Sequence, residues 1–199
     1  MLASKDQSGF NAGMFFIKVN EWSIKTLVQA MSYEWHKPDI DLGFLEQTSL
    51  YYEMNNTVNR PHVLYEPRKW FNTYEFHHAY EGEKGYMMVH FPGLEDDRWA
   101  HMSKWLDILE GPGQAEWEVP LQETHYPQEI AAFWAMLDLS KQMLVKGKER
   151  AGNAGVYGKD LKAAIEHLDT VLWSETDQVE AMRLAAAEVQ KVLQAVDGG

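Results

Sequence analysis

A histidine that ends a short apolar run is the strongest candidate for chemistry in this sequence. His90 closes the run that begins at Tyr86, and Phe91-Pro92-Gly93 follows it with the composition of a tight turn. We expect this arrangement to present the imidazole to an edge or a cleft, where it can ligate a divalent metal or carry a proton. The alternative is a histidine that caps the strand through a backbone hydrogen bond.

A carboxylate beside a carboxamide is the second candidate. Glu46 and Gln47 lie in the first turns of a predicted helix, after the loop that contains Asp39 and Asp41. Together they offer acceptors and donors for sugar hydroxyls, although the pair is also typical of ordinary helix surface. The Asp-x-Asp spacing matches a carboxylate pair that holds Mg²⁺ or Mn²⁺ on a nucleotide diphosphate. Acidic residues before a helix are, however, expected as caps.

Two further histidines, His77 and His78, could join His90 in a metal cluster, which would make the protein a histidine-based metalloenzyme of another kind. Adjacent side chains rarely point the same way, and no HExxH spacing accompanies them. We therefore expect one of them to line a cleft. The sequence also lacks the G-x-S-x-G, GxGxxG and P-loop patterns, which removes the commonest hydrolase, dehydrogenase and kinase interpretations.

Composition limits the class of protein further. The 199 residues are 45% hydrophobic and 24% charged, as in globular domains, and the absence of cysteine excludes iron–sulfur sites, thiol nucleophiles and cystine scaffolds. A net charge of −12 without a basic run argues against nucleic acid as a partner. Aromatic residues make up 13%, and such side chains line carbohydrate clefts as well as ordinary cores. No apolar run is long enough for a membrane span or a signal peptide.

The elements that must position these residues alternate between strands and helices. The pattern predicts strands at 14–19, 62–65 and 86–91 and helices at 21–31 and 44–54, which indicates a mixed α/β body. A charged, glycine-rich stretch follows at 146–158 and is typical of a linker. We therefore predict a body over residues 1–145, a linker over 146–158 and a separate tail over 159–199.

The tail has the pattern of a helical hairpin that serves as a scaffold. A first apolar stripe runs from Leu161 to Leu172 at steps of three and four residues, and a second runs from Val179 to Val196. Ser174 has the position of an N-cap for the second helix, with Asp177 three residues later. We expect the pair to pack on the body or on a second chain.

Taken in order, segments over residues 9–135 resemble the fungal galactosyl/mannosyltransferases of glycosyltransferase family 34. The segments that carry the resemblance are Asn11–Lys18 with Glu21–Ser23, Glu46-Gln47, Pro67-Arg68 with Asn72–Tyr74, Val89–Gly93, and Arg98-Trp99. The resemblance implies the C-terminal half of a GT-A fold, a nucleotide-sugar donor, Mn²⁺ and transfer to a glycan acceptor with retention of configuration. It also implies a location at the Golgi membrane or in its lumen.

The resemblance also assigns roles to residues. His90 would be the third protein ligand of the metal, and Glu46 and Gln47 would be catalytic, with the carboxylate facing the reacting sugar. Asn11, Gly13 and Gly93 would border the donor, and Arg98 would contact its diphosphate. The remaining candidates would line the cleft or hold the acceptor; these are Asn72, Tyr74, His77 and His78.

The sequence departs from the family at several points. The metal-binding Asp-x-Asp precedes the Asn-x-Gly segment by many tens of residues in the family, whereas ten residues precede Asn11 here and Asp39-x-Asp41 follows it. Tyr86 stands after Gly85 where the family has an aspartate, and no N-terminal anchor or signal is present. These differences indicate an incomplete donor half.

Two functions therefore remain open from the sequence. One is a retaining glycosyltransferase that moves a hexose or pentose, with galactose, mannose and xylose all among the family's donor sugars. The other is a non-catalytic remnant that binds a glycan or another glycosyltransferase subunit through its aromatic cleft and helical tail.

Overall fold

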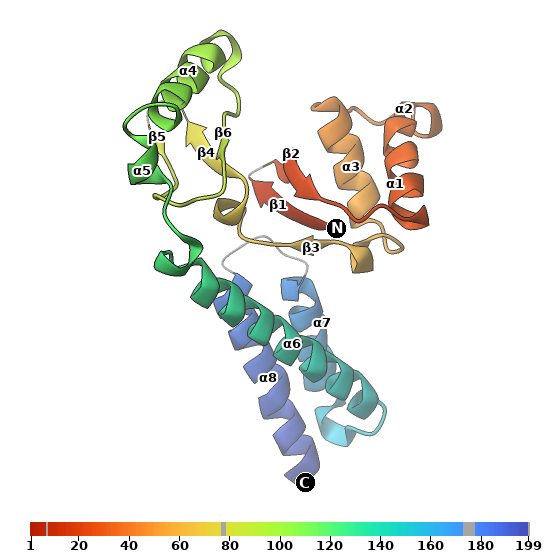
Figure 1. Cartoon of the computed structure of the whole chain (residues 1–199). Helices are drawn as coiled ribbons and strands as arrows, with labels where there is room; N and C mark the ends of the chain where they lie inside the picture. Colours follow the sequence, from red (N-terminus) through yellow and green to blue (C-terminus); the bar gives the residue numbers. More distant parts are fainter. Residues whose placement is uncertain (7, 77–78, 173–177, 199) are drawn as a thin grey trace. The chain divides into compact units, whose positions relative to one another are not determined.

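The computed structural model describes residues 1–6, 8–76, 79–172 and 178–198, and it is a mixed α/β structure (Figure 1). The chain divides into two compact units, Met1–Thr124 and His125–Gly199. The first unit holds both small sheets, and the second is helical. No helix within the described residues is long and apolar enough to cross a membrane.

The first sheet of the N-terminal unit has three strands. Strands β1 (Leu2–Asp6) and β2 (Gly9–Phe16) pair antiparallel, and β3 (Leu64–Tyr65) pairs parallel with β1, which gives the order β2-β1-β3. Gly9 begins β2 with a φ of 96°, a conformation that favours glycine. A Cβ there would also lie 2.7 Å from the ring of Tyr51. The register places Ser4 opposite Asn11, which lines the cavity of the candidate site.

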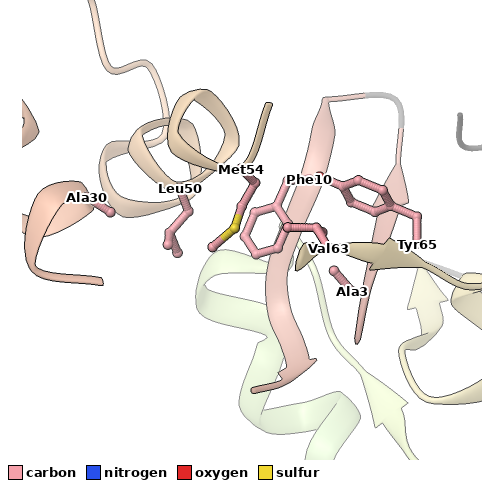
Figure 2. Packing of buried hydrophobic residues seen from close by; sticks show 7 residues of the cluster. All are labelled: Ala3, Phe10, Ala30, Leu50, Met54, Val63 and Tyr65. Carbon is pink, nitrogen blue, oxygen red and sulfur yellow. The ribbon is translucent and has the colours of Figure 1, made fainter. Parts of the chain in front are cut away.

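Helices α1 (Glu21–Met31) and α3 (Leu45–Asn55) pack beside this sheet, with the short helix α2 (Tyr33–His36) between them in sequence. Helix α1 begins at a capping box in which Asn20 and Ser23 satisfy each other's backbone N–H groups. Figure 2 shows how side chains from the sheet and the helices form one core. Its members are Ala3, Phe10, Ala30, Leu50, Met54, Val63 and Tyr65.

The second sheet has the order β5-β4-β6. Strand β4 (Thr73–Phe76) lies between β5 (Ala79–Tyr80), which is antiparallel to it, and β6 (Val89–His90), which is parallel. The parallel register places Tyr74 opposite His90. The other elements of this unit are η1 (Arg60–His62), η2 (Arg68–Trp70), η3 (Glu95–Asp97), α4 (Arg98–Leu109), α5 (Gln114–Trp117) and η4 (Leu121–Glu123).

The second unit consists of α6 (Tyr126–Ala151), η5 (Gly155–Tyr157), α7 (Gly158–Leu172) and α8 (Gln178–Gly198), and the three long helices lie side by side (Figure 1). The predicted C-terminal helical pair is confirmed. Leu161, Ile165, Leu168 and Leu172 are all buried on α7, as their spacing predicts. The proposed cap at Ser174 and Asp177 lies outside the described residues.

The structure differs from the predicted linker at residues 146–158. Helix α6 continues through Ala151, so the first part of that stretch is helical. Gly147 is buried, and a Cβ on it would lie 2.9 Å from Cγ1 of Ile165 on α7. Here the glycine allows two helices to approach closely, rather than providing a flexible connection. The boundary between the compact units falls earlier, after Thr124.

Candidate functional site

A cavity of about 560 Å³ in the first unit collects residues that lie far apart in the sequence. Its walls come from β1 and β2, from the start of α3, and from β4 and β6 with the turn that follows β6. The residues that line it are Asp6, Ser8, Asn11, Ala12, Gly13, Phe44, Glu46, Gln47, Tyr74, Met88, Val89, His90, Phe91, Pro92, Gly93 and Arg98. This volume lies within the range of small-molecule sites.

His90 is held in this cavity by Asn72. The imidazole Nδ1 lies 2.7 Å from Oδ1 of Asn72, whose own Nδ2 donates to Oδ1 of Asn11 and Oγ of Ser4 at 2.8 and 2.9 Å. Because the amide oxygen can only accept, Nδ1 carries the proton and the neutral ring keeps a lone pair on Nε2. The site thus holds a histidine whose Nε2 can accept a proton or bind a metal.

The electrostatic surroundings keep His90 neutral. Burial lowers its pKa below the ordinary value of 6.5, and the positive charges of Arg68 and Arg98 lower it further, against an opposite effect of Asp6. Gly13 makes room for the ring, because a Cβ on it would lie only 2.1 Å from Cε1 of His90. Any residue other than glycine at position 13 would therefore have to displace the imidazole.

A polar network around Asp6 forms the floor of the cavity. Oδ2 of Asp6 accepts from Nδ2 of Asn11 at 2.7 Å and from the hydroxyl of Tyr74 at 2.6 Å, and Asn11 also donates to that hydroxyl. Oδ1 of Asp6 accepts the backbone N–H of Ser8 at 2.8 Å. Burial and the hydrogen bond to Asp6 raise the pKa of Tyr74, so the phenol remains protonated and donates.

An arginine lies against Tyr74. The guanidinium of Arg68 is 3.7 Å from the centre of the Tyr74 ring, and it pairs with Glu81 at 2.6 Å. Its second terminal nitrogen is buried without a hydrogen-bond partner among the described residues. This arrangement fixes the Tyr74 ring and places a positive charge near His90.

Glu46 and Gln47 enter the cavity from the start of α3. Oε1 of Gln47 accepts the backbone N–H of Ala12 at 3.0 Å, which ties the helix to β2. Glu46 is exposed at the wall, where its carboxylate can face a ligand. Arg98, also exposed, begins α4 at another wall. The cavity therefore offers a carboxylate, a carboxamide, a guanidinium and an imidazole to one occupant.

The structure brings together most of the residues predicted from the sequence. Within the described part of the chain, all of them line the cavity except Asn72, which is fully buried behind it and orients His90 and Asn11. His77 and His78 lie outside the described residues. Asp39 and Asp41 are exposed and do not line the cavity.

Sequence reasoning missed Asp6 and Ser8. The signal that could have found them is the run Asp6-Gln7-Ser8-Gly9, whose residue types are typical of a turn between two strands. In such a hairpin Asp6 pairs with Gly9, and β2 then runs back alongside β1. Recognising the hairpin would therefore have placed Asp6 close to Asn11.

The donor set for a metal is sparse. Among the described residues there is no group of three histidine, cysteine or acidic side chains that could hold a metal ion. His90 offers one nitrogen, whereas Asp6 already accepts hydrogen bonds through both of its oxygens. The described residues that line the cavity therefore supply Nε2 of His90 and the exposed carboxylate of Glu46, and these do not by themselves complete a metal site.

Comparison of the chain with models of protein families, with curated proteins and with solved structures gives no match.

Proposed function

We propose that the first unit takes part in glycosyl transfer with retention of configuration, and that its cavity binds a nucleotide-sugar at the sugar and diphosphate. What supports the proposal is the convergence of Asn11, Gly13, Glu46, Gln47 and His90 on one cavity together with Gly93 and Arg98. These residues come from separate segments.

The chemistry of the lining residues agrees with this reaction. Transfer breaks the bond between the anomeric carbon and the diphosphate and forms a bond to an acceptor hydroxyl, whose proton passes to the departing phosphate oxygen. Positive charge develops at the anomeric carbon, where the carboxylate of Glu46 would stabilise it. Negative charge grows on the diphosphate, where the guanidinium of Arg98 would bind.

Hydrogen bonds in the cavity suit the donor sugar. Oε1 of Gln47 accepts the backbone N–H of Ala12, and its Nε2 group donates to no residue among those described, so it can donate to a ligand. Tyr74 and Asn11 are locked in place by Asp6 and Asn72, so the polar floor is preorganised before a ligand arrives. In this proposal the donor is UDP- or GDP-linked, with galactose, mannose or xylose as the sugar, and the acceptor is a glycan of the Golgi.

Mn²⁺ belongs to the proposal as a partner of the nucleotide. Nε2 of His90 would be this chain's ligand to the ion. A divalent ion on a diphosphate offsets the charge of the leaving group.

The sparse metal ligands favour a second candidate function. Because the described residues include no group of three histidine, cysteine or acidic side chains, the cavity could bind a glycan or another glycosyltransferase subunit without catalysing transfer. The two functions differ in whether binding needs a nucleotide and Mn²⁺.

A donor-turnover assay separates the two. The full chain is incubated with UDP-galactose, GDP-mannose or UDP-xylose and Mn²⁺, with and without oligosaccharide acceptors, and release of the nucleotide is measured. The catalytic proposal predicts release with one donor, its loss in His90→Ala, and no loss in the control His36→Ala, which changes an exposed histidine of α2. If no donor releases its nucleotide, and glycan binding is the same with and without Mn²⁺, the catalytic proposal is overturned and the second function is favoured.

A further inference from the structure

An apolar groove of about 360 Å³ lies beside the candidate site, between helices α1 and α3 of the first unit. Glu46 lines both the groove and the cavity of the candidate site, and the next residue back along the chain but one, Phe44, lines that cavity too. The groove and the cavity therefore meet at the start of α3. Most of the groove's walls are aliphatic side chains, those of Leu27, Met31, Leu42, Leu45 and Leu50.

The floor of the groove suits a hydrocarbon ligand. Ala30 and Leu50 are buried there. Ser49 is buried as well, and its hydroxyl donates to the backbone oxygen of Glu46 at 3.0 Å. Because this hydroxyl already has an acceptor, an aliphatic chain can cover the floor without leaving a donor unpaired.

The rim of the groove exposes large apolar side chains to water. Met31 is 86% exposed, Leu45 is 63% exposed and Phe44 is 62% exposed. Leu45 also has a φ of 37°, in the left-handed region that residues with a bulky side chain seldom adopt. The backbone thus holds an apolar side chain at the rim at some conformational cost. An aliphatic ligand that covers these side chains removes their surface, and its own, from water.

The charges beside the groove favour a neutral head group on that ligand. Glu34 and Glu46 are exposed on the groove and form no ion pair within the described part of the chain, so they disfavour a carboxylate or phosphate head. In the adjoining cavity, Asp6 already accepts hydrogen bonds through both oxygens, and Arg98 disfavours a cationic head. Sugar hydroxyls carry no charge and can donate to the carboxylate of Glu46.

We propose that the groove binds the aliphatic aglycone of a neutral glycoside, whose sugar lies at Glu46, where the groove meets the cavity. The inference rests on the proposed function and deepens it, because it makes the acceptor a sugar that carries an aliphatic chain. The groove contributes binding alone, and no bond forms or breaks in it.

The first test varies the length of the chain. Methyl, butyl, hexyl and octyl glucosides are titrated below their micelle concentrations into the full chain, without nucleotide or Mn²⁺, and the methyl resonances of leucine and methionine are followed by NMR. Burial of each added methylene should strengthen binding about twofold to threefold, so octyl glucoside should bind at least about tenfold more tightly than butyl glucoside. Equal affinity of the two, or no binding of either, would overturn the proposal.

The second test varies the head group on a constant chain. Octanoate and octylammonium should each bind at least about threefold more weakly than octyl glucoside, because the first meets the carboxylates of Glu34 and Glu46 and the second lacks the hydroxyls. If either ion binds as tightly as octyl glucoside, the site does not select a sugar and the proposal fails.

A polar substitution at the rim locates the chain. Leu45→Asn introduces a residue type that tolerates the left-handed region, and it should weaken octyl glucoside at least about fivefold while leaving methyl glucoside unchanged. Leu121→Asn changes a leucine of η4 that is 57% exposed and lines neither the groove nor the cavity, so it is the matched control and should change neither affinity. Equal effects of the two substitutions would contradict the assignment of the groove.

A second pair of variants separates this groove from another apolar cavity of the first unit. Met31→Gln keeps the length of the side chain but makes the rim polar, and it should weaken octyl glucoside about threefold or more. Met87→Gln, at a methionine that is 65% exposed and lines a separate cavity of about 390 Å³, should leave the affinity unchanged. A response to Met87→Gln and not to Met31→Gln would place the chain in that other cavity and overturn the proposal.

Turnover distinguishes failure of this inference from failure of the proposed function. If a donor is turned over with the same KM for methyl and octyl glucosides as acceptors, the proposed function stands and the inference fails. If the affinity rises with chain length and falls in Leu45→Asn, but no donor is turned over, the groove binds the chain as proposed and the proposed function fails.

Discussion

The side chains of His90 and Asn72 form the central contact of the candidate site, with Nδ1 of the imidazole 2.7 Å from Oδ1 of the amide. Asn72 is fully buried, and it reaches three partners on three different segments: His90, Asn11 and Ser4. One amide thus links the second sheet to the first and sets the tautomer of the histidine.

Replacing this amide should be costly. Asn72→Ala leaves the hydroxyl of Ser4 and the imidazole N–H without this partner, and it removes one of the two hydrogen bonds that the amide oxygen of Asn11 accepts. We therefore expect the free energy of unfolding to fall by about 3 kcal/mol. Urea denaturation of the full chain measures it. Asn55→Ala, at an exposed position of α3, is the matched control and should change the value by less than about 0.5 kcal/mol. A similar small change in both variants would contradict the linking role of Asn72.

Gly13 should not tolerate even one added methyl group. In Gly13→Ala the new Cβ would start 2.1 Å from Cε1 of His90, so the ring must move and its bond to Asn72 must lengthen. We expect a loss of about 1–3 kcal/mol and a shift of the His90 imidazole resonances. Gly43→Ala, whose Cβ would meet nothing within 4 Å, should leave both unchanged. Unshifted His90 resonances in Gly13→Ala would show that the ring does not occupy this position.

The protonation of His90 gives a prediction about pH. Burial, followed by the charges of Arg68 and Arg98, lowers its pKa in the folded protein below 6.5. Below pH 6.5 the unfolded chain therefore binds the proton more readily than the folded one, and stability falls as the pH falls from 6.5 toward the lowered pKa. NMR titration of the ring should report a pKa below 6.5, and Arg98→Ala should raise it. A pKa above 6.5 would contradict the neutral tautomer.

A buried carboxyl gives a prediction of the opposite slope. Burial raises the pKa of Glu66, which follows β3, to about 7. The folded state therefore holds its proton more tightly than the unfolded chain does, and stability is lost as the pH rises from about 4.5 to about 7.

Glu66→Gln removes this penalty. At pH 8 the variant should be more stable than the parent by about 3 kcal/mol, and at pH 4 the two should be nearly equal. Chemical denaturation at both pH values measures the difference, with the exposed Glu34→Gln as control. If the difference in stability between variant and parent is the same at pH 8 as at pH 4, the carboxyl of Glu66 ionises normally.

The helices were predictable where the signals are local. The range 21–31 predicted for α1 is the one observed, because the spacing of its apolar residues lies within the helix and a capping box begins at Asn20, directly before it. The stripe on α7 was predictable for the same reason. Helix α6 was missed, although Pro127 in its first turn is a common start signal.

The strands and the centre of the site depend on contacts that sequence spacing does not reveal. The strand predicted at 86–91 is reduced to Val89–His90, which pairs with β4, an element the pattern did not predict. Asn72 lies 61 residues from Asn11 and 18 from His90, so their hydrogen bonds form only once the sheets are assembled. Asn72 was expected to line the cleft; its position behind the cavity follows from that assembly.

The most direct test of the proposed function is the thermal stability of the 199-residue chain with UDP and with GDP, each with and without Mn²⁺. At about 100 times its dissociation constant, a nucleotide should stabilise the fold by roughly 2.7 kcal/mol. The proposal predicts a rise in Tm with one nucleotide that depends on Mn²⁺ and disappears in His90→Ala but not in His36→Ala. A chain that melts cooperatively at the same temperature under all four conditions would contradict a nucleotide-sugar site in this cavity.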